Sequence, residues 1–241
     1  MKMNKSILVI IIMISTSVEI RSQELSIAEP AIEALAEYPK VRDFTMSILA
    51  KEAYFTIQSP LEELAVIARL KLVNNVWAEP EIVSFSGEYK DLEPFLSPNG
   101  LRLYFVSNRP LDDTTTTIKD YDIWYVERES ISTIWSAPIN IGSSVNTAYD
   151  EFYPSVANNN NLYFTRDSPD TKGKDDIFFS EWQDGNYKLP QSISDSINTA
   201  SYEFNSYVSP DETFIIFSGY NRKGGFGSGD LYISFRNHHG V

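Results

Sequence analysis

The stretch DEFYPSVANNNNLYFTRD, residues 150–167, decides the fold because two close variants of it occur elsewhere in the chain. The upstream variant is DLEPFLSPNGLRLYFVSNR, residues 91–109, and the downstream variant is YEFNSYVSPDETFIIFSGY, residues 202–220. Each contains an acidic residue, a short apolar strand, a turn and a second apolar strand. Self-similarity of this kind indicates a repeat architecture, which has to be recognised before any single motif is interpreted.

The repeat continues beyond these stretches. A third strand opens on Asp122, Asp176 and Asp230, which follow one another at intervals of about 54 residues. A fourth strand is expected to close on an aromatic residue and a proline, as in the segments 77–80, 135–138 and 187–190. The four repeats span about 41–80, 89–138, 149–190 and 201–241.

The second and third strands of each repeat are apolar on both faces, as in LYF (103–105) and DIWYV (122–126). A strand of this kind must be covered on both sides, and four-stranded sheets packed face to face around an axis provide that cover. A two-sheet sandwich does not repeat the same turn at this interval. We therefore predict an all-β protein, a β-propeller of four-stranded antiparallel blades with four visible repeats.

The two ends of the chain raise the question of closure. The fourth repeat stops near the position expected for its last strand, whereas SIAEPAI (26–32) echoes VWAEPEI (76–82). Residues 24–32 are therefore a candidate closing strand within a propeller that spans 23–241. Either four blades close on themselves, or the chain is part of a larger propeller of about six or more blades, which we favour.

The N-terminus has the order of a secretory signal peptide. Lys2 and Lys5 precede an apolar run over 7–14, and small polar residues follow, which predicts a signal peptide over 1–22. The apolar run is too short for a membrane span, which needs about 20 residues. The chain has no cysteine, and an exported protein without disulfides indicates a bacterial envelope. We expect a periplasmic or secreted protein that is not transmembrane, although it could associate with the envelope.

The series SPNG, LYFVSNR, DYDIWYV, Trp135 and Pro138 resembles the WD40-like, TolB-type β-propeller repeat family of bacterial envelope proteins. The resemblance covers about residues 24–241. It implies the propeller fold, which serves as a scaffold, a binding module or occasionally an enzyme domain. The chain departs from the family pattern in the first repeat, where SILAKEA (47–53) has lost the turn, and at ANNNN (157–161).

One rim of the predicted propeller is expected to carry any binding surface. The start of the first strand, the end of the second and the start of the third share this rim in an antiparallel blade. Variable loops over 108–121, 167–175 and 220–229 lie beside it, and rigid scaffolds display function on such loops. In the first repeat, Asp43 and Glu63 take the matching acid positions. The candidate binding residues are Asp91, Arg109, Asp122, Glu151, Arg166, Asp176, Glu203, Arg222 and Asp230.

Two interpretations of these residues are open. The acids could capture Ca²⁺ or a basic peptide, or each could accept backbone hydrogen bonds from its own turn. Recurrence in every repeat favours the turn interpretation. The arginines could hold an acidic sugar or another carboxylate, or they could pair with the rim acids, which we favour.

Catalytic patterns are scarce. His238 and His239 are the only histidines, and GGFGSG (224–229) joins two strands rather than opening a helix. We assign no catalytic residue, no metal ligand set and no cofactor, with Ca²⁺ as the one candidate ion. The net charge of −13 excludes nucleic acid as an expected partner.

The predicted function is an exported, non-enzymatic scaffold or binding module for a protein or glycan-linked partner. The alternative is a propeller glycosidase or lyase that acts on acidic polysaccharide, or the propeller domain of a peptidase.

Overall fold

The computed structural model of the chain describes residues 32–47, 49–111 and 117–236. The predicted signal peptide, residues 24–31 of the candidate closing strand and both histidines lie outside these residues. The described residues form one short 3-10 helix, η1 (Glu33–Glu37), and otherwise strands and turns. Within them, no helix is long and apolar enough to cross a membrane.

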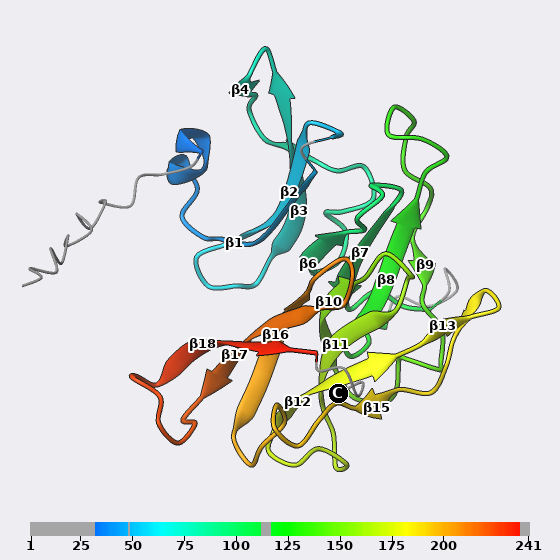
Figure 1. The fold of residues 1–241 in the computed structure, drawn as a ribbon. Coiled ribbons are helices and arrows are strands. Elements are labelled where there is room, and N and C mark those ends of the chain that lie inside the picture. The colour runs from blue at the N-terminus through cyan, green and yellow to red at the C-terminus, as the bar shows by residue number, and fades with distance from the viewer. Residues whose placement is uncertain (1–31, 48, 112–116, 237–241) are drawn as a thin grey trace, which may run out of the picture. The chain divides into compact units, whose positions relative to one another are not determined.

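Four antiparallel sheets follow one another along the chain as propeller blades (Figure 1). Blade 1 contains β1 (Val41–Ser47), β2 (Glu52–Gln58), β3 (Ala65–Val73) and β5 (Glu81–Ile82). Blade 2 contains β6 (Asp91–Leu96), β7 (Arg102–Ser107), β8 (Asp122–Glu127) and β9 (Ile139–Asn140). Blade 3 contains β10 (Glu151–Val156), β11 (Leu162–Asp167), β12 (Asp175–Ser180) and β15 (Gln191–Ser192). Blade 4 contains β16 (Tyr202–Val208), β17 (Phe214–Tyr220) and β18 (Gly229–Phe235).

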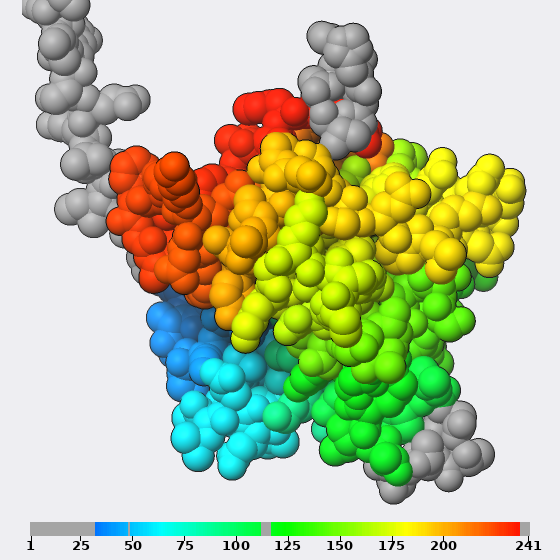
Figure 2. Space-filling model, turned by 90° about the horizontal axis from the view of Figure 1, so that it is seen from below, coloured from blue at the N-terminus to red at the C-terminus, as the bar shows by residue number. Residues whose placement is uncertain are grey.

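The predicted all-β propeller with four repeats is confirmed. Figure 2 shows the blades side by side in chain order, from cyan in blade 1 through green and yellow to orange in blade 4. Three blades have four or more strands, whereas blade 4 has three within the described residues. A larger propeller of about six or more blades stays a prediction.

The outermost strands differ from the prediction. They follow the proline of each repeat as β5, β9 and β15, rather than ending on it. Trp77 and Tyr187 lie instead in small hairpins, formed by β4 (Val76–Trp77) with β3 and by β13 (Trp182–Gln183) with β14 (Asn186–Tyr187). The physical reason is that proline has no N–H for the strand ladder, so the chain turns at the proline and pairs only after it.

A β-bulge interrupts the first strand of every blade at the same point. The register between the first two strands shifts after Arg42, Leu92, Phe152 and Phe204. The next residue in each strand has a left-handed backbone, with φ between 51° and 57°: Asp43, Glu93, Tyr153 and Asn205. A bulge inserts one extra residue and re-aims the local side chains, so these four residues are structural equivalents.

This register corrects the predicted alignment of blade 1. Asp43 is the counterpart of Glu93 and not of Asp91, and Val41 occupies the first-strand acid position. Glu63 precedes β3, in which Val66 stands where the other blades have an aspartate. Blade 1 therefore lacks both rim acids. The sequence alignment of blade 1 was wrong by two residues, because nothing in the residue composition marks the position of the bulge.

Three of the four core clusters lie between neighbouring blades, and the fourth lies between blade 1 and η1. Tyr54 and Ile67 of blade 1 pack on blade 2, and the equivalent residues of blades 2 and 3 pack on the next blade. On the receiving side, Phe105, Phe164 and Phe217 occupy one common register position. The middle strands of blades 2 and 3 are therefore covered on both faces by a neighbouring sheet, as their two apolar faces require.

Trp124 tests this packing. Its side chain is 5% exposed within the interface between blades 1 and 2. Replacement by alanine should lower the free energy of unfolding by about 3–5 kcal/mol, because it leaves a cavity in a packed core. Urea unfolding measures the loss, with Ile134→Ala, a change at a 91% exposed side chain, as the control. A loss as small as that of the control would contradict the described interface.

Candidate functional site

The two predicted rim acids that lie at the start of the first strands of blades 3 and 4 are buried and bonded to their own turns. Glu151 accepts hydrogen bonds from the backbone N–H of Thr147 at 3.0 Å and from its Oγ1 at 2.7 Å. Glu203 binds Thr199 in the same way, at 2.8 and 2.7 Å. Both carboxylates are 0% exposed. The two carboxylates thus stabilise the turn that leads into the first strand of each blade.

The aspartates at the start of the third strands have similar local partners. Asp176 and Asp230 each accept a backbone N–H at 2.9 Å, from residues 172 and 226 of their own loops. Asp122 accepts from Lys119 Nζ at 3.1 Å and from Asn140 Nδ2 at 3.1 Å. The contacts of Asp176 and Asp230 are the ones that the turn interpretation describes, whereas the partners of Asp122 are side chains. A role of the aspartates in binding stays a prediction.

The three predicted arginines each lie over an aromatic ring of their own third strand. The guanidinium carbons lie 5.5, 4.1 and 4.8 Å from the ring centroids, in the pairs Arg109–Trp124, Arg166–Phe178 and Arg222–Tyr232. Two of the arginines also pair with the first-strand acid of their blade, Arg109 with Asp91 at 2.7 Å and Arg222 with Glu203 at 3.2 Å. Arg166 pairs with Asp170 at 3.1 Å.

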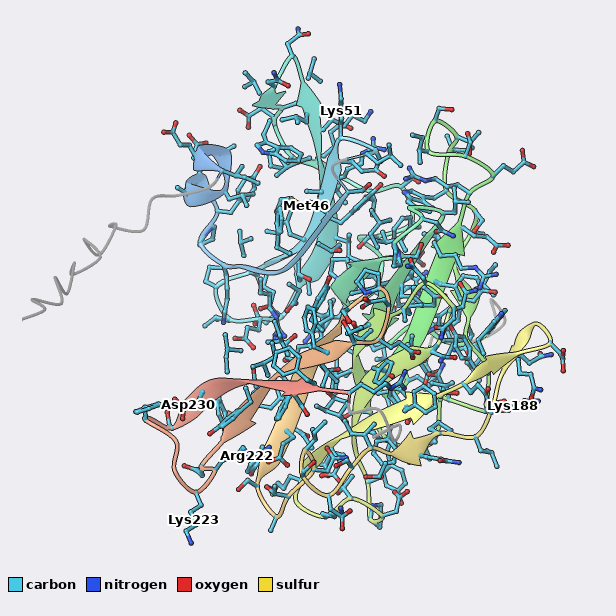
Figure 3. All side chains as sticks on the ribbon, in the orientation of Figure 1. Met46, Lys51, Lys188, Arg222, Lys223 and Asp230 are labelled. Carbon is cyan, nitrogen blue, oxygen red and sulfur yellow. The ribbon has the colours of Figure 1, made fainter. Side chains whose placement is uncertain are left out.

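The arginines reach this common place from different sequence positions. Ser107, Arg166 and Gly219 share one register position, so Arg109 and Arg222 start two and three residues further along the chain. Gly219 makes room for this in blade 4, because a Cβ there would lie 2.6 Å from Arg222 Cδ. Figure 3 shows Arg222 and Asp230 at the same end of blade 4. The three arginines could not be aligned in the sequence, because they start from different positions in their repeats and only the folded chain brings their side chains to equivalent places.

A polar cluster at the bulges was missed by the sequence analysis. Arg42 Nη2 donates to Glu93 Oε1 at 3.0 Å and to Tyr153 Oη at 2.9 Å, and Arg42 Nε lies 2.7 Å from Asp43 Oδ2. Tyr153 N–H donates to Glu93 Oε2 at 2.6 Å. Thr56 Oγ1 donates to Asp43 at 3.2 Å and accepts from Glu93 N–H at 3.0 Å. We call these five residues the central cluster, which ties blades 1, 2 and 3 together.

One guanidinium in this cluster faces two buried carboxylates. Burial raises the pKa of Glu93 to about 8, and the neighbouring charge of Asp43 adds to the effect. Burial also raises the pKa of Asp43 above its ordinary value, against the opposing charge of Arg42. Like charges in a low-dielectric site cannot both ionise freely, so the pair retains a proton near neutral pH.

A row of aromatic rings adjoins the central cluster. Successive ring centroids lie 5.4, 6.2, 5.9, 5.1 and 6.4 Å apart. The rings belong, in that order, to Tyr121, Phe152, Tyr153, Phe204, Tyr220 and Tyr202. We call this set the aromatic row. All six rings are at least partly exposed. Tyr121 and Phe152 also pack against the core between blades 2 and 3, and the guanidinium of Arg42 lies over the ring of Tyr153.

The aromatic row lines a cavity of about 680 Å³. Blades 1 and 2 supply polar side chains to the same cavity, among them Arg42, Gln58 and Glu93. A second cavity of about 350 Å³ is lined by all four bulge residues, including Asn205. The sequence contains one signal for this site, the aromatic residue that follows each of the acids Glu151 and Glu203. Composition alone does not distinguish such an aromatic residue from a core residue.

Metal ligands do not gather in the described part of the chain. Among residues 32–47, 49–111 and 117–236, no group of three or more histidine, aspartate or glutamate side chains could hold a metal ion. The rim acids have protein partners in place of a shared centre. The Ca²⁺ prediction therefore has no ligand set among these residues.

No known protein family and no curated protein matches the chain. Solved structures do resemble it. A puromycin-hydrolysing peptidase of Mycobacterium tuberculosis superposes with a TM-score of 0.50 at 10% identity, over 76% of this chain and 26% of its own. The Hadza microbial sialidase Hz136 superposes with a TM-score of 0.52 at 13% identity, over 83% of this chain and 45% of its own. Hydrazine synthase of Kuenenia stuttgartiensis superposes with a TM-score of 0.51 at 11% identity, over 77% of this chain and 30% of its own.

The chain thus spans between about a quarter and under half of the length of these proteins. At such low identity the likeness shows the fold alone, a β-propeller. The activity of this chain has to be argued from its own site.

The proton held by the central cluster predicts a pH dependence of stability. A carboxyl whose pKa is raised in the folded state stabilises the fold at low pH, and this stabilisation is lost as the pH rises through the folded pKa. For Glu93 the window runs from its ordinary value of 4.5 to about 8. The free energy of unfolding should therefore fall between these pH values by a few kcal/mol.

The variant Asp43→Asn isolates this contribution. It removes the competing carboxylate and leaves Arg42 to Glu93 alone, so the pKa of Glu93 should fall and the slope should flatten. Urea unfolding at pH 5, 6, 7 and 8 measures the slope, with Glu81→Gln on the exposed β5 as the charge control. A slope that is the same in wild type and Asp43→Asn would show that the two carboxylates do not share a proton.

Proposed function

We propose that this protein is a β-propeller binding module that takes a carbohydrate in the cavity lined by the aromatic row. The observation that carries the proposal is the aromatic row itself, six partly exposed rings beside the charged and amide groups of Arg42, Glu93 and Gln58. Sugar rings present apolar C–H faces that pack on aromatic rings and hydroxyl groups that need donors and acceptors. The cavity supplies both kinds of surface.

The size and exposure of the cavity support the same proposal. A volume of about 680 Å³ lies within the range of about 300–1,000 Å³ that is usual for small-ligand sites. Tyr220 is 45% exposed although it belongs to a packed row of rings. Aromatic surface gathered in one place and left open to water favours a binding site over core packing.

The geometry favours binding over hydrolysis. Glycoside hydrolysis generally needs two carboxyl groups that flank the scissile bond. Three carboxyl groups line the cavity, those of Glu62, Glu93 and Asp175. Both oxygens of Glu93 are engaged, by Arg42 and by the backbone of Tyr153, and Glu62 pairs with Lys40, so two of the three are held by protein partners. We therefore favour the binding module over the two alternative functions, a glycosidase or lyase and the propeller domain of a peptidase.

The setting of this function is also part of the proposal. The resemblance to WD40-like, TolB-type repeats and the charged, apolar and small-residue order of residues 1–22 support a periplasmic or secreted protein of a bacterial envelope. A glycan of the envelope, or a protein that carries one, is the partner that fits such a location. The rim loops beside Arg109, Arg166 and Arg222 are a second candidate surface for the same partner.

Tyr220 provides the test. Binding to a panel of neutral and acidic soluble polysaccharides is measured by affinity electrophoresis. We expect at least one polysaccharide to retard the wild type, and Tyr220→Ala to weaken that binding by about tenfold, because one stacking ring is lost. Tyr149→Ala is the matched control, since Tyr149 is also 45% exposed but does not line this cavity.

Three outcomes decide between the functions. Equal weakening by Tyr220→Ala and Tyr149→Ala would contradict binding at the aromatic row. Failure of every polysaccharide to bind would contradict the carbohydrate. Release of shorter saccharides during incubation would favour the glycosidase or lyase instead.

A further inference from the structure

Two buried side chains of the cavity lined by the aromatic row carry polar atoms without a partner. Gln58 is 5% exposed and Thr165 is 1% exposed, and both line this cavity. Gln58 Oε1 and Thr165 Oγ1 are shielded from water, and neither has a hydrogen bond within residues 32–47, 49–111 and 117–236. A buried polar atom without a partner destabilises a fold, so two of them in one cavity need a physical reason.

The position of Thr165 is satisfied in blade 1. Thr56 and Thr165 are structural equivalents, because each lies opposite the residue before the bulge of its own blade. Thr56 donates to the carboxylate of Asp43, the left-handed residue of its bulge. The left-handed residue of blade 3 is Tyr153, which has no carboxylate and whose hydroxyl group binds the guanidinium of the central cluster. The fold thus supplies an acceptor to Thr56 and not to Thr165.

The position of Gln58 is satisfied in blade 2. Gln58 N–H donates to the carbonyl of Lys40 at 3.0 Å, and Asn108 N–H donates to that of Lys90 at 3.4 Å, so the two residues are equivalents. Asn108 Oδ1 also accepts from Lys90 N–H at 3.0 Å. Gln58 is one methylene longer, and its oxygen makes no such bond to the described residues. Both unpartnered atoms therefore stand where an equivalent blade satisfies its own side chain.

The charges that line this cavity balance one another. Arg42 is held by the two carboxyl groups of the central cluster, and Glu62 is held by Lys40. Lys90 and Asp175 also line the cavity and have no ion pair among the described residues, but they are opposite in sign. The cavity therefore offers no excess of either charge to a ligand. The net charge of −13 also repels polyanions.

We infer that the ligand of this cavity is a neutral saccharide whose hydroxyl groups bind Gln58 and Thr165, which rests on the function proposed above and adds the class of sugar to it. A hydroxyl group can donate to Gln58 Oε1 and can donate to or accept from Thr165 Oγ1. The carboxylate of an acidic sugar only accepts, so it satisfies neither Gln58 Oε1 nor the carboxyl group of Asp175. Both side chains rotate toward the ligand when it binds, since their polar atoms are shielded from water before that.

Thr165→Val tests the contact with the sugar. The variant keeps the shape of the side chain and removes an atom that has no partner in the fold, so the melting temperature should stay the same or rise. Affinity electrophoresis in gels that contain galactomannan, xyloglucan or a soluble β-glucan measures binding. We expect at least one of these neutral polysaccharides to retard the wild type, and Thr165→Val to weaken that binding by about five- to tenfold.

Ser206→Ala is the matched control. Ser206 is 6% exposed and its Oγ also lacks a partner among the described residues, but it lines the second cavity and not this one. Binding should therefore be unchanged in Ser206→Ala. Gln58→Leu is the second variant, and it should weaken binding of the same polysaccharide in the same direction as Thr165→Val.

Polygalacturonate and alginate are the acidic probes. We expect neither to retard the wild type, and we expect binding of the neutral polysaccharide to change by less than about twofold between low and high salt. Retardation by the acidic probes alone would overturn the neutral class.

The variants separate this inference from the proposed function. Wild-type affinity in both Thr165→Val and Gln58→Leu, with weakened binding in Tyr220→Ala, would overturn the inference and leave the carbohydrate site standing. Equal weakening by Ser206→Ala and Thr165→Val would overturn the inference as well. Wild-type affinity in Tyr220→Ala, or failure of every polysaccharide to bind, would contradict the proposed function and the inference together.

Discussion

The β-bulge in the first strand of each blade is the constraint on which the centre of this protein depends. It places Asp43, Glu93, Tyr153 and Asn205 in the left-handed backbone region, where a tyrosine is unfavourable by about 1–3 kcal/mol. The bonds that Tyr153 makes to Glu93 and Arg42 offset this cost. All four residues line the second cavity, where the blades meet. Two of them, Glu93 and Tyr153, also line the larger cavity in which the ligand is proposed to bind.

The acidity of the chain has a different structural meaning from the one that its total suggests. With a charge of −13 and a repeated rim acid, the sequence allowed two interpretations, a cation-binding mouth or acids that hold their own turns, and it favoured the turns. In the structure, Glu151 and Glu203 accept hydrogen bonds from their own turns, and Asp91 forms an ion pair with Arg109. The rim charges therefore act on the fold of each blade, and the open surface near the centre is aromatic.

Much of the fold could be predicted from the sequence because its signals are local. The turn at Ser97-Pro98-Asn99-Gly100 and the strands with two apolar faces are each defined by a few adjacent residues. These signals were sufficient to predict the four blades. The errors came from features that local patterns do not record. The bulge shifted Asp43 by two positions, and the outer strands formed only after the prolines. The central cluster joins residues 42, 93 and 153, which only the closure of the blades brings together.

A crystal structure of the full chain with a bound oligosaccharide tests the central claim most directly. The account predicts a sugar ring stacked on Phe204 or Tyr220, with its hydroxyl groups toward Arg42 and Gln58. An oligosaccharide bound only at the rim loops, against Arg109, Arg166 or Arg222 and away from the aromatic row, would contradict it.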